Sequence, residues 1–214
     1  MCRTLRETEQ NPTIFGVVIA GGRSVRFGGE KAAAELAGKP LLMWAVRRLQ
    51  RSCTRVAVNT RPETQTEALA RAEGLAILYD TPGDAAGPLA GVKVGLAWAK
   101  GLGARAIAVS PCDAPLLPDD LFIRLIDAAG AGAAMAETAE GRQPLCAIWP
   151  VNALVAVTEA LAGGAHPATW RVLESIGAKL VRFPDAEAFA NLNTREELAA
   201  IAAGMERRPT SDRD

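Results

Sequence analysis

Short apolar runs alternate with amphipathic stretches along most of this 214-residue chain. Consecutive parallel strands need long crossover connections, which are usually helices, so this alternation predicts a mostly parallel sheet with helices on both faces. The expected fold class is α/β, with a three-layer α/β/α, Rossmann-like arrangement. Strands are predicted near 14–20, 54–59, 75–79, 105–110, 132–137, 144–149 and 178–183. Helices are predicted near 40–51, 62–73, 89–100, 118–129, 151–162, 168–176 and 194–204.

No linker-like stretch divides this pattern, so residues 14–204 are expected to form one domain. The polar ends, at 1–13 and 205–214, are expected to be flexible extensions. The first 13 residues lack the apolar core of a secretory signal, and no run of 18 apolar residues occurs anywhere. A cytoplasmic location without a membrane partner is therefore expected.

Charge and cysteine content exclude several functional classes. Lys plus Arg and Asp plus Glu both number 24, which argues against a broad basic surface for nucleic acid or anionic lipid. The four cysteines are widely spaced and form no CxxC motif, so neither a zinc ribbon nor a disulfide framework is indicated. Any functional positive charge must be local.

A cationic glycine loop follows the first predicted strand. It runs from Ala20 through Gly21, Gly22 and Arg26 to Lys31. Glycines let backbone N–H groups approach a ligand closely, and the cations suit a nucleoside triphosphate. The loop matches neither GxxxxGK[ST] nor GxGxxG, which disfavours a P-loop NTPase and a dinucleotide-binding domain. The alternative is a glycine-rich surface turn with solvated charges.

Further polar residues follow other predicted strands, where ligands bind in open parallel sheets. Asn59 and Asp80 are in such positions, although Asp80 could instead stabilise a β-turn. Asp113 lies between Pro111 and Pro115, and a carboxylate there suits Mg²⁺. The competing role for Asp113, capping a helix near residue 118, is weaker because two other aspartates lie closer to that helix.

Five ordered segments resemble the motifs of the molybdenum cofactor guanylyltransferases. They are AGGRSVRFGGEK with GKPLL, VNT, YDTPGDAAGPLAG, SPCDAPLLP and NLNTREEL, and they extend over roughly residues 14–200. The resemblance implies a nucleotide-diphospho-sugar transferase-like fold. It also implies transfer of GMP from GTP to Mo-molybdopterin, with release of pyrophosphate. Molybdenum-insertion enzymes and molybdoenzyme chaperones are the further partners it suggests.

The resemblance also implies roles for individual residues. The nucleotide-binding set is Ile19, Ala20, Gly21, Gly22, Lys31, Asn59, Asp80 and Asp113, and Asp113 is also the Mg²⁺ ligand. Asn191 and Asn193 match an Asn-x-Asn motif expected near the acceptor substrate. The family usually has aspartate where this chain has Glu30, and the sequence assigns Glu30 no role.

The expected reaction does not require a general base. A phosphomonoester has a second pKa near ~6, so at neutral pH it is already mostly a dianionic nucleophile. The single histidine, His166, is therefore not required and is expected to be a loop residue. Catalysis should consist of positioning and charge neutralisation by Mg²⁺, Arg26 and Lys31.

Arg142 and a separate cluster of three arginines can each be interpreted in two ways. Arg142 precedes a predicted strand and could bind the phosphate of the pterin or be solvated. Arg47, Arg48 and Arg51 are expected on or near one face of a helix, as a solvated face or as a docking patch. Neither group is decisive for the function.

Three other functions remain open. A CTP-dependent molybdopterin cytidylyltransferase is the nearest, although its loop more often reads Ala-Ala-Gly than Ala20-Gly21-Gly22. A non-catalytic protein that binds and delivers the molybdenum cofactor is the second, and a sugar-1-phosphate nucleotidyltransferase is the third. Turnover with different nucleotides would separate them.

Overall fold

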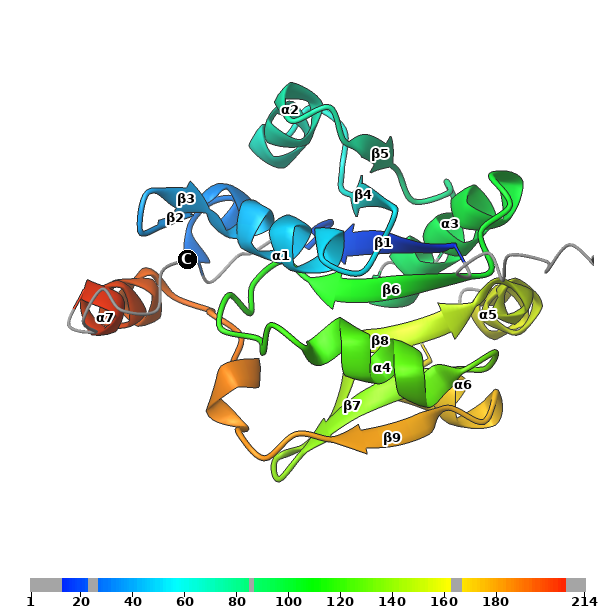
Figure 1. Cartoon of the computed structure of the whole chain (residues 1–214). Coiled ribbons are helices and arrows are strands. Elements are labelled where there is room, and N and C mark those ends of the chain that lie inside the picture. The colour runs from blue at the N-terminus through cyan, green and yellow to red at the C-terminus, as the bar shows by residue number, and fades with distance from the viewer. Residues whose placement is uncertain (1–12, 23–26, 85–86, 163–166, 207–214) are drawn as a thin grey trace, which may run out of the picture.

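The computed structural model describes residues 13–22, 27–84, 87–162 and 167–206. A seven-stranded sheet lies between two layers of helices, as Figure 1 shows. The predicted three-layer α/β/α fold is therefore confirmed. The predicted extensions at 1–13 and 205–214 fall outside the described residues, apart from Thr13, Met205 and Glu206.

Parallel pairing dominates one half of the sheet. β1 pairs in parallel with β4 and β6, and β4 pairs in parallel with β5. The carboxyl ends of these four strands therefore meet at one edge, where ligands bind in such sheets. In spatial order the strands are β5 (Ala76–Leu78), β4 (Arg55–Asn59), β1 (Ile14–Ile19), β6 (Ala106–Pro111), β8 (Gly141–Pro150), β7 (Ala134–Thr138) and β9 (Lys179–Arg182).

The strand β8 runs antiparallel to both of its neighbours, β6 and β7. It begins at Gly141, three residues before the strand predicted near 144–149, so Arg142 belongs to the strand and does not precede it. Pro144 is tolerated because the register shifts between Met135 and Ala136, whose partners on β8 are Ala147 and Gln143. Proline lacks an N–H donor and is normally confined to such irregularities.

Apolar side chains on the two faces of the sheet pack against two sets of helices. On one face, Val18 and Val58 pack with α1 (Leu41–Gln50), α2 (Gln65–Ala72) and α4 (Leu121–Ala129). On the other face, Phe15 and Val17 pack with α3 (Pro88–Gly101), α5 (Leu154–Leu161) and α6 (Thr169–Ser175). Most of the core therefore comes from the two faces of a single sheet.

A smaller core lies beside the glycine loop. The short hairpin of β2 (Glu35–Leu36) and β3 (Lys39–Pro40) packs through Leu36 on α7 (Arg195–Glu206). Thr194 forms a capping box at the start of α7, because its hydroxyl accepts from Glu197 N at 3.1 Å and its N–H donates to the Glu197 carboxylate at 3.2 Å. The C-terminal helix thus begins next to the carboxyl edge.

Three 3₁₀ helices complete the described elements. They are η2 (Lys31–Ala33), which follows the glycine loop, η3 (Val151–Ala153), which leads into α5, and η5 (Glu187–Phe189), which precedes α7. The sequence pattern predicted none of them as separate elements. Of the three, η2 matters most for function because it carries Lys31.

The arginine group on α1 does not form one solvated face. Arg47 and Arg51 are exposed, but Arg48 is 7% exposed and points into the protein. The prediction of a common solvated or docking face is therefore wrong for Arg48. Periodicity alone could not separate these residues, because adjacent helical positions differ by only about 100°.

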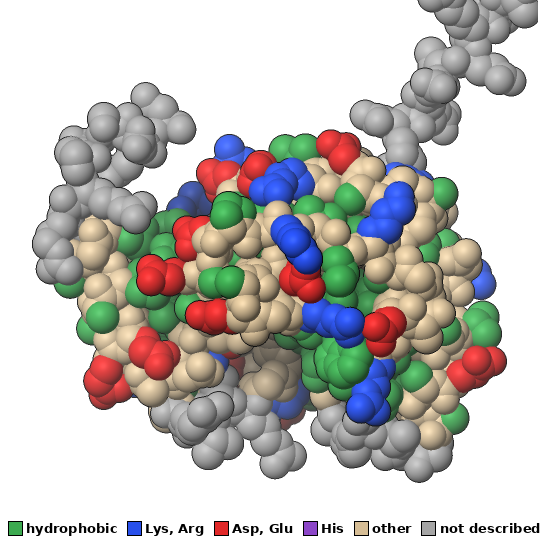
Figure 2. Space-filling model, turned by 90° about the horizontal axis from the view of Figure 1, so that it is seen from below, with side chains coloured by type: hydrophobic (Ala, Val, Ile, Leu, Met, Phe, Trp, Pro, Cys, Tyr) green, Lys and Arg blue, Asp and Glu red, His purple; other side chains and the backbone are tan. Residues whose placement is uncertain are grey.

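The surface shows no segregation into one sign of charge on the face drawn in Figure 2, where acidic, basic and apolar side chains are intermingled. Cys53, Cys112 and Cys146 are free thiols. Within the described ranges, none of the helices combines the length and apolarity needed to cross a membrane.

Gly91 lies on α3 where the helix packs tightly against the ends of β1 and β4. A Cβ at this position would collide with Asn59 Oδ1 and lie 2.8 Å from Ile19 Cδ1. We expect Gly91→Ala to destabilise the protein by about 1–3 kcal/mol, because overpacking outweighs the gain in helix propensity. Urea unfolding measures this change.

Gly101→Ala, in the last turn of the same helix, is the matched control. No heavy atom outside its own neighbourhood lies within 4 Å of a Cβ added there. We expect it to leave stability unchanged or to raise it by up to ~1 kcal/mol. Equal stability of the two variants would contradict the packing argument.

Candidate active site

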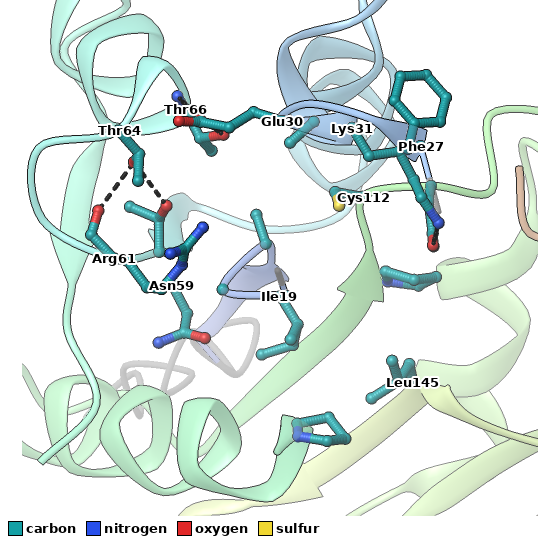
Figure 3. Close-up of a pocket in the computed structure, with 18 of the residues that line it drawn as sticks. Ile19, Phe27, Glu30, Lys31, Asn59, Arg61, Thr64, Thr66, Cys112 and Leu145 are labelled. Atoms are coloured by element: carbon teal, nitrogen blue, oxygen red, sulfur yellow. Dashed lines mark hydrogen bonds and ion pairs between the residues drawn. The ribbon is translucent and has the colours of Figure 1, made fainter. Parts of the chain in front are cut away.

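A cavity of about 630 Å³ opens at the carboxyl edge of the parallel strands. Figure 3 shows side chains converging on it from the ends of β1, β4 and β6 and from the loop that precedes η2. Nine of the predicted site residues line it: Ile19, Ala20, Gly21, Gly22, Lys31, Asn59, Asp80, Asp113 and Asn193. Segments that are distant in sequence therefore form one site.

The backbone after β1 forms one wall of the cavity. Ala20 N donates to the carbonyl of Asn59 at 2.8 Å, which extends the pairing of β1 with β4 by one residue. A Cβ at Gly22 would meet no heavy atom within 4 Å, so the backbone there is open to a ligand. The predicted Arg26 lies outside the described residues.

Lys31 connects three segments of the chain. Its Nζ lies 2.8 Å from Asp113 Oδ2 and donates to Asn193 Oδ1 at 3.1 Å. Their side chains are largely shielded, with exposures of 10% for Lys31 and 21% for Asp113. Lys31 and Asp113 therefore place opposite charges next to each other, and both residues line the cavity.

Asn59 and Asp80 form a second polar pair. Asn59 Nδ2 donates to Asp80 Oδ1 at 2.8 Å and to the carbonyl of Leu78 at 3.3 Å. These bonds orient the Asn59 amide, which is only 2% exposed. They also hold the Asp80 carboxylate at the cavity wall, where it can accept hydrogen bonds from a ligand.

Two predicted acceptor-binding residues lie outside the cavity lining. The Arg142 guanidinium lies 3.0 Å from the carboxylate of Glu174 and 4.7 Å from the ring centroid of Trp170. Asn191 is exposed, and its carbonyl accepts from Asn193 Nδ2 at 3.2 Å. Of the three residues predicted for the acceptor, only Asn193 reaches the cavity.

Several lining residues were missed by the sequence analysis. They are Phe27, Glu30, Ala32, Thr60, Arg61, Thr64, Thr66, Gly87, Pro88, Pro111, Cys112 and Leu145. Thr60 and Arg61 had a usable signal, because they directly follow Asn59 at the end of a strand. Leu145 had none, because the direction of β8 was not predicted.

Glu30 now has a structural role. Its carboxylate accepts from the backbone N–H groups of Gln65 at 3.0 Å and Thr66 at 2.8 Å, and from the Thr66 hydroxyl at 2.9 Å. These groups form the N-terminus of α2, where a negative charge is favourable. Glu30 directly precedes Lys31, so these hydrogen bonds tie the chain next to Lys31 to a separate helix.

The same contacts change the acidity of Glu30. Burial by itself raises the pKa of this carboxyl, but the hydrogen bonds from Thr66 and Gln65, with the nearby Arg61 charge, outweigh it and lower the pKa below its usual value. A lowered pKa means that the ionised form stabilises the folded state. That stabilisation is present above the ordinary carboxyl pKa and is lost as the pH falls through the lowered one.

Cys112 contributes a thiol to the cavity wall. Burial, with the neighbouring Asp113 charge, raises the pKa of Cys112 to about 12. A thiol of this acidity is protonated at neutral pH in the ligand-free protein, and a protonated thiol is a poor nucleophile.

The donors in the cavity fit a metal that arrives with its ligand. Among the described residues, no three His, Cys, Asp or Glu side chains form a group that could hold an ion alone. Asp113 supplies one carboxylate to the cavity, and Mg²⁺ typically takes one or two carboxylates together with phosphate oxygens and water. The residues therefore fit Mg²⁺ bound to a nucleotide, and do not fit a cage made only of protein groups.

The Glu30 contacts generate a prediction. We expect Glu30→Gln to lower the free energy of unfolding by about 1 kcal/mol at pH 7, because the charged cap of α2 is lost. The difference from the unmodified protein should shrink as the pH falls through the lowered pKa of Glu30, because the carboxylate then becomes protonated. Urea unfolding at a series of pH values measures it.

Glu73→Gln is the control for this comparison, because Glu73 is an exposed residue at the other end of α2. Its unfolding free energy should stay within about 0.5 kcal/mol of the unmodified protein at every pH. A pH-independent effect of Glu30→Gln would show that the carboxylate charge is not responsible.

Comparison with known proteins identifies the family. The model of the MobA-like NTP transferase domain matches residues 16–182. A molybdenum cofactor guanylyltransferase of Cereibacter sphaeroides is 38% identical over 190 residues, covering 87% of this chain and 94% of that protein. One of Cupriavidus necator is 36% identical over 195 residues, covering 86% and 94%.

Solved structures support the fold. The crystal structure of molybdopterin-guanine dinucleotide biosynthesis protein A from Archaeoglobus fulgidus superposes with a TM-score of 0.71. It is 21% identical and covers 91% of this chain and 100% of its own. The family expected from the five motifs is thus confirmed, and the chain belongs to the MobA-like NTP transferase family.

Proposed function

We propose that this chain transfers GMP from GTP to Mo-molybdopterin, forming molybdopterin guanine dinucleotide and releasing pyrophosphate. One observation carries the proposal: the Lys31–Asp113 ion pair lies in the same cavity as the glycine loop and the Asn59–Asp80 pair. Together these groups suit a polyanion that also carries hydrogen-bonding groups. The names of the relatives at 36–38% identity support the same reaction.

Asp80 favours guanine among the nucleobases. A carboxylate only accepts hydrogen bonds, and guanine presents two adjacent donors, N1–H and the 2-amino group. Cytosine and adenine each present one amino donor beside a ring nitrogen that is an acceptor, which would face the carboxylate unfavourably. The position of Asp80 in the cavity wall therefore supports GTP over CTP and ATP.

The remaining nucleotide contacts follow from the cavity walls. We assign the backbone of Ile19–Gly22 to nucleotide binding. This backbone lines the cavity, and the two glycines have no side chain that would keep a ligand away from it. Lys31 is assigned to the phosphates. Arg26 stays a prediction for the same role.

The reaction requires little from the protein except charge and position. An oxygen of the acceptor phosphate attacks the α-phosphorus of GTP, the bond from that phosphorus to the bridging oxygen of the β-phosphate breaks, and pyrophosphate leaves. The acceptor phosphate is already a dianion, so no general base is needed. Lys31 holds positive charge where two anions must approach each other.

We assign Mg²⁺ to Asp113. When bound with the nucleotide, the ion would neutralise phosphate charge, as in phosphoryl transfer generally. Asn193, next to Lys31 in the cavity, is assigned to the acceptor side of the site. Arg142 and Asn191 remain predictions there, as do a cytoplasmic location, a single domain at 14–204, and delivery partners among molybdenum-insertion enzymes and molybdoenzyme chaperones.

Pyrophosphate release with Mo-molybdopterin and Mg²⁺ tests the proposed function, using GTP, CTP and ATP in parallel. We expect kcat/KM for GTP to exceed the values for CTP and ATP by roughly 10–100-fold, which is the usual discrimination from one good pair of hydrogen bonds to a base. Preference for CTP would make the chain a cytidylyltransferase. Tight GTP binding without turnover would make it a binding protein.

Asp113→Asn tests the metal assignment in the same assay. We expect kcat to fall by about 10³-fold or more, because the amide carries no charge to hold the ion against the phosphates. Asp119→Asn is the control, since that exposed carboxylate lies 2.9 Å from Arg51 at the surface and its loss should leave kcat unchanged. A near-normal rate of Asp113→Asn at saturating Mg²⁺ would show that Asp113 is not the ligand.

A further inference from the structure

Arg48 is a buried cation that the proposed reaction does not use. It is 7% exposed, and its Nη2 donates to the carbonyl of Pro115 at 2.9 Å. Its Nε and Nη1 atoms are also buried and have no hydrogen-bond partner among the described residues. Burying a guanidinium with incomplete hydrogen bonding is costly, so filling space is a poor reason for an arginine here.

The contact partner of Arg48 belongs to the segment that carries Asp113. This segment connects β6 to α4 and contains Asp113 and Pro115 two residues apart. A second backbone contact comes from the N–H of Leu192, which donates to the carbonyl of Asp113 at 2.8 Å. The backbone around Asp113 is therefore bonded to Arg48 and to the segment before α7, in addition to the ion pair of its side chain with Lys31.

The helix that carries Arg48 is also fixed to the Lys31 segment. Leu41 N, at the start of α1, donates to the carbonyl of Ala34 at 2.8 Å, and Ala34 N donates to the carbonyl of Lys31 at 3.0 Å. Ala32 is buried in the same apolar cluster as Leu42 on α1. One helix thus contacts the segments of both members of the ion pair.

We propose that Arg48 is a positioning residue that fixes the Asp113 segment relative to Lys31 and so sets the metal-binding geometry of the site. This inference rests on the proposed function, because it takes Asp113 as the metal ligand. Arg48 itself does not reach the cavity lining. Its effect passes through the Pro115 carbonyl.

Neighbouring arginines supply a control. Arg51 is the C-cap residue of α1, three positions after Arg48. Its guanidinium pairs with Asp119 at 2.9 Å, with both side chains more than half exposed. Such a surface pair contributes little to stability. Asp119 is at the far end of the segment, six residues from Asp113 and next to the start of α4. Arg51→Met therefore removes a cation from the same helix without removing the proposed positioning contact.

The test compares Arg48→Met, Arg48→Lys and Arg51→Met in the full chain. The primary measurement is the affinity for Mn²⁺ in the presence of a GTP analogue with a methylene group between the α- and β-phosphates, followed by electron paramagnetic resonance. Affinity for this analogue in EDTA, kcat, and the free energy of unfolding are measured alongside. The Mn²⁺ measurement does not require turnover.

We expect Arg48→Met to weaken Mn²⁺ binding at least tenfold and to lower kcat at least 30-fold, while analogue affinity in EDTA stays within threefold. Arg48→Lys keeps one donor with a different reach, so it should weaken Mn²⁺ binding threefold to tenfold. Arg51→Met should stay within twofold in every measurement.

The inference is overturned if Arg48→Met folds and binds Mn²⁺ within twofold of the unmodified protein, even if its stability is lower. If Arg48→Met does not fold, Mn²⁺ affinity within twofold in Arg48→Lys overturns it instead. Absence of turnover in the unmodified protein with intact Mn²⁺ binding would count against the proposed function and leave the comparison valid. Absence of Mn²⁺ binding in the unmodified protein would overturn the inference.

Discussion

The ion pair between Lys31 and Asp113 is the interaction on which the rest of the site depends. Lys31 follows the glycine loop, Asp113 follows β6, and Asn193, which also contacts Lys31, precedes α7. The contact therefore joins segments that are 82 and 162 residues apart in sequence. A lysine next to a carboxylate can help a site to accept phosphates in two ways. The lysine is a fixed positive charge, and the carboxylate can bind a metal ion that arrives with the phosphates.

The parallel half of the sheet explains why these groups meet. Strands that run in the same direction bring their following residues to one edge, and here that edge collects the glycine loop, Asn59 and Asp113. Hydrogen bonds to neighbouring helices hold these segments in place. Glu30 ties the loop to the start of α2, and Arg48 ties the Asp113 segment to α1. The reaction proposed for this site is direct transfer between two bound anions, in which the protein neutralises charge and holds the reactants in position.

Much of this arrangement could be predicted from sequence because its signals are local. Strand and helix periodicity, the glycine loop and polar residues at strand ends can each be recognised within a short stretch of sequence. Asp113, which was singled out in this way, lines the cavity. The features that were missed depend on long-range packing. Glu30 accepts hydrogen bonds from residues 35 and 36 positions away, and Arg48 donates to Pro115 at a separation of 67 residues. The antiparallel direction of β8 depends on its pairing with β6 and β7. Arg142 is outside the cavity lining because Glu174 and Trp170 of α6 lie beside it, which no local pattern could indicate.

The stereochemistry at the transferred phosphorus tests direct transfer most sharply. GTP with sulfur replacing one α-phosphate oxygen, in a single configuration, would be turned over with Mo-molybdopterin, and the configuration of the product would be determined. One in-line attack by the acceptor phosphate inverts the configuration at phosphorus. Direct transfer therefore predicts inversion. Retention would require two displacements and an intermediate bonded to the protein, and would contradict it.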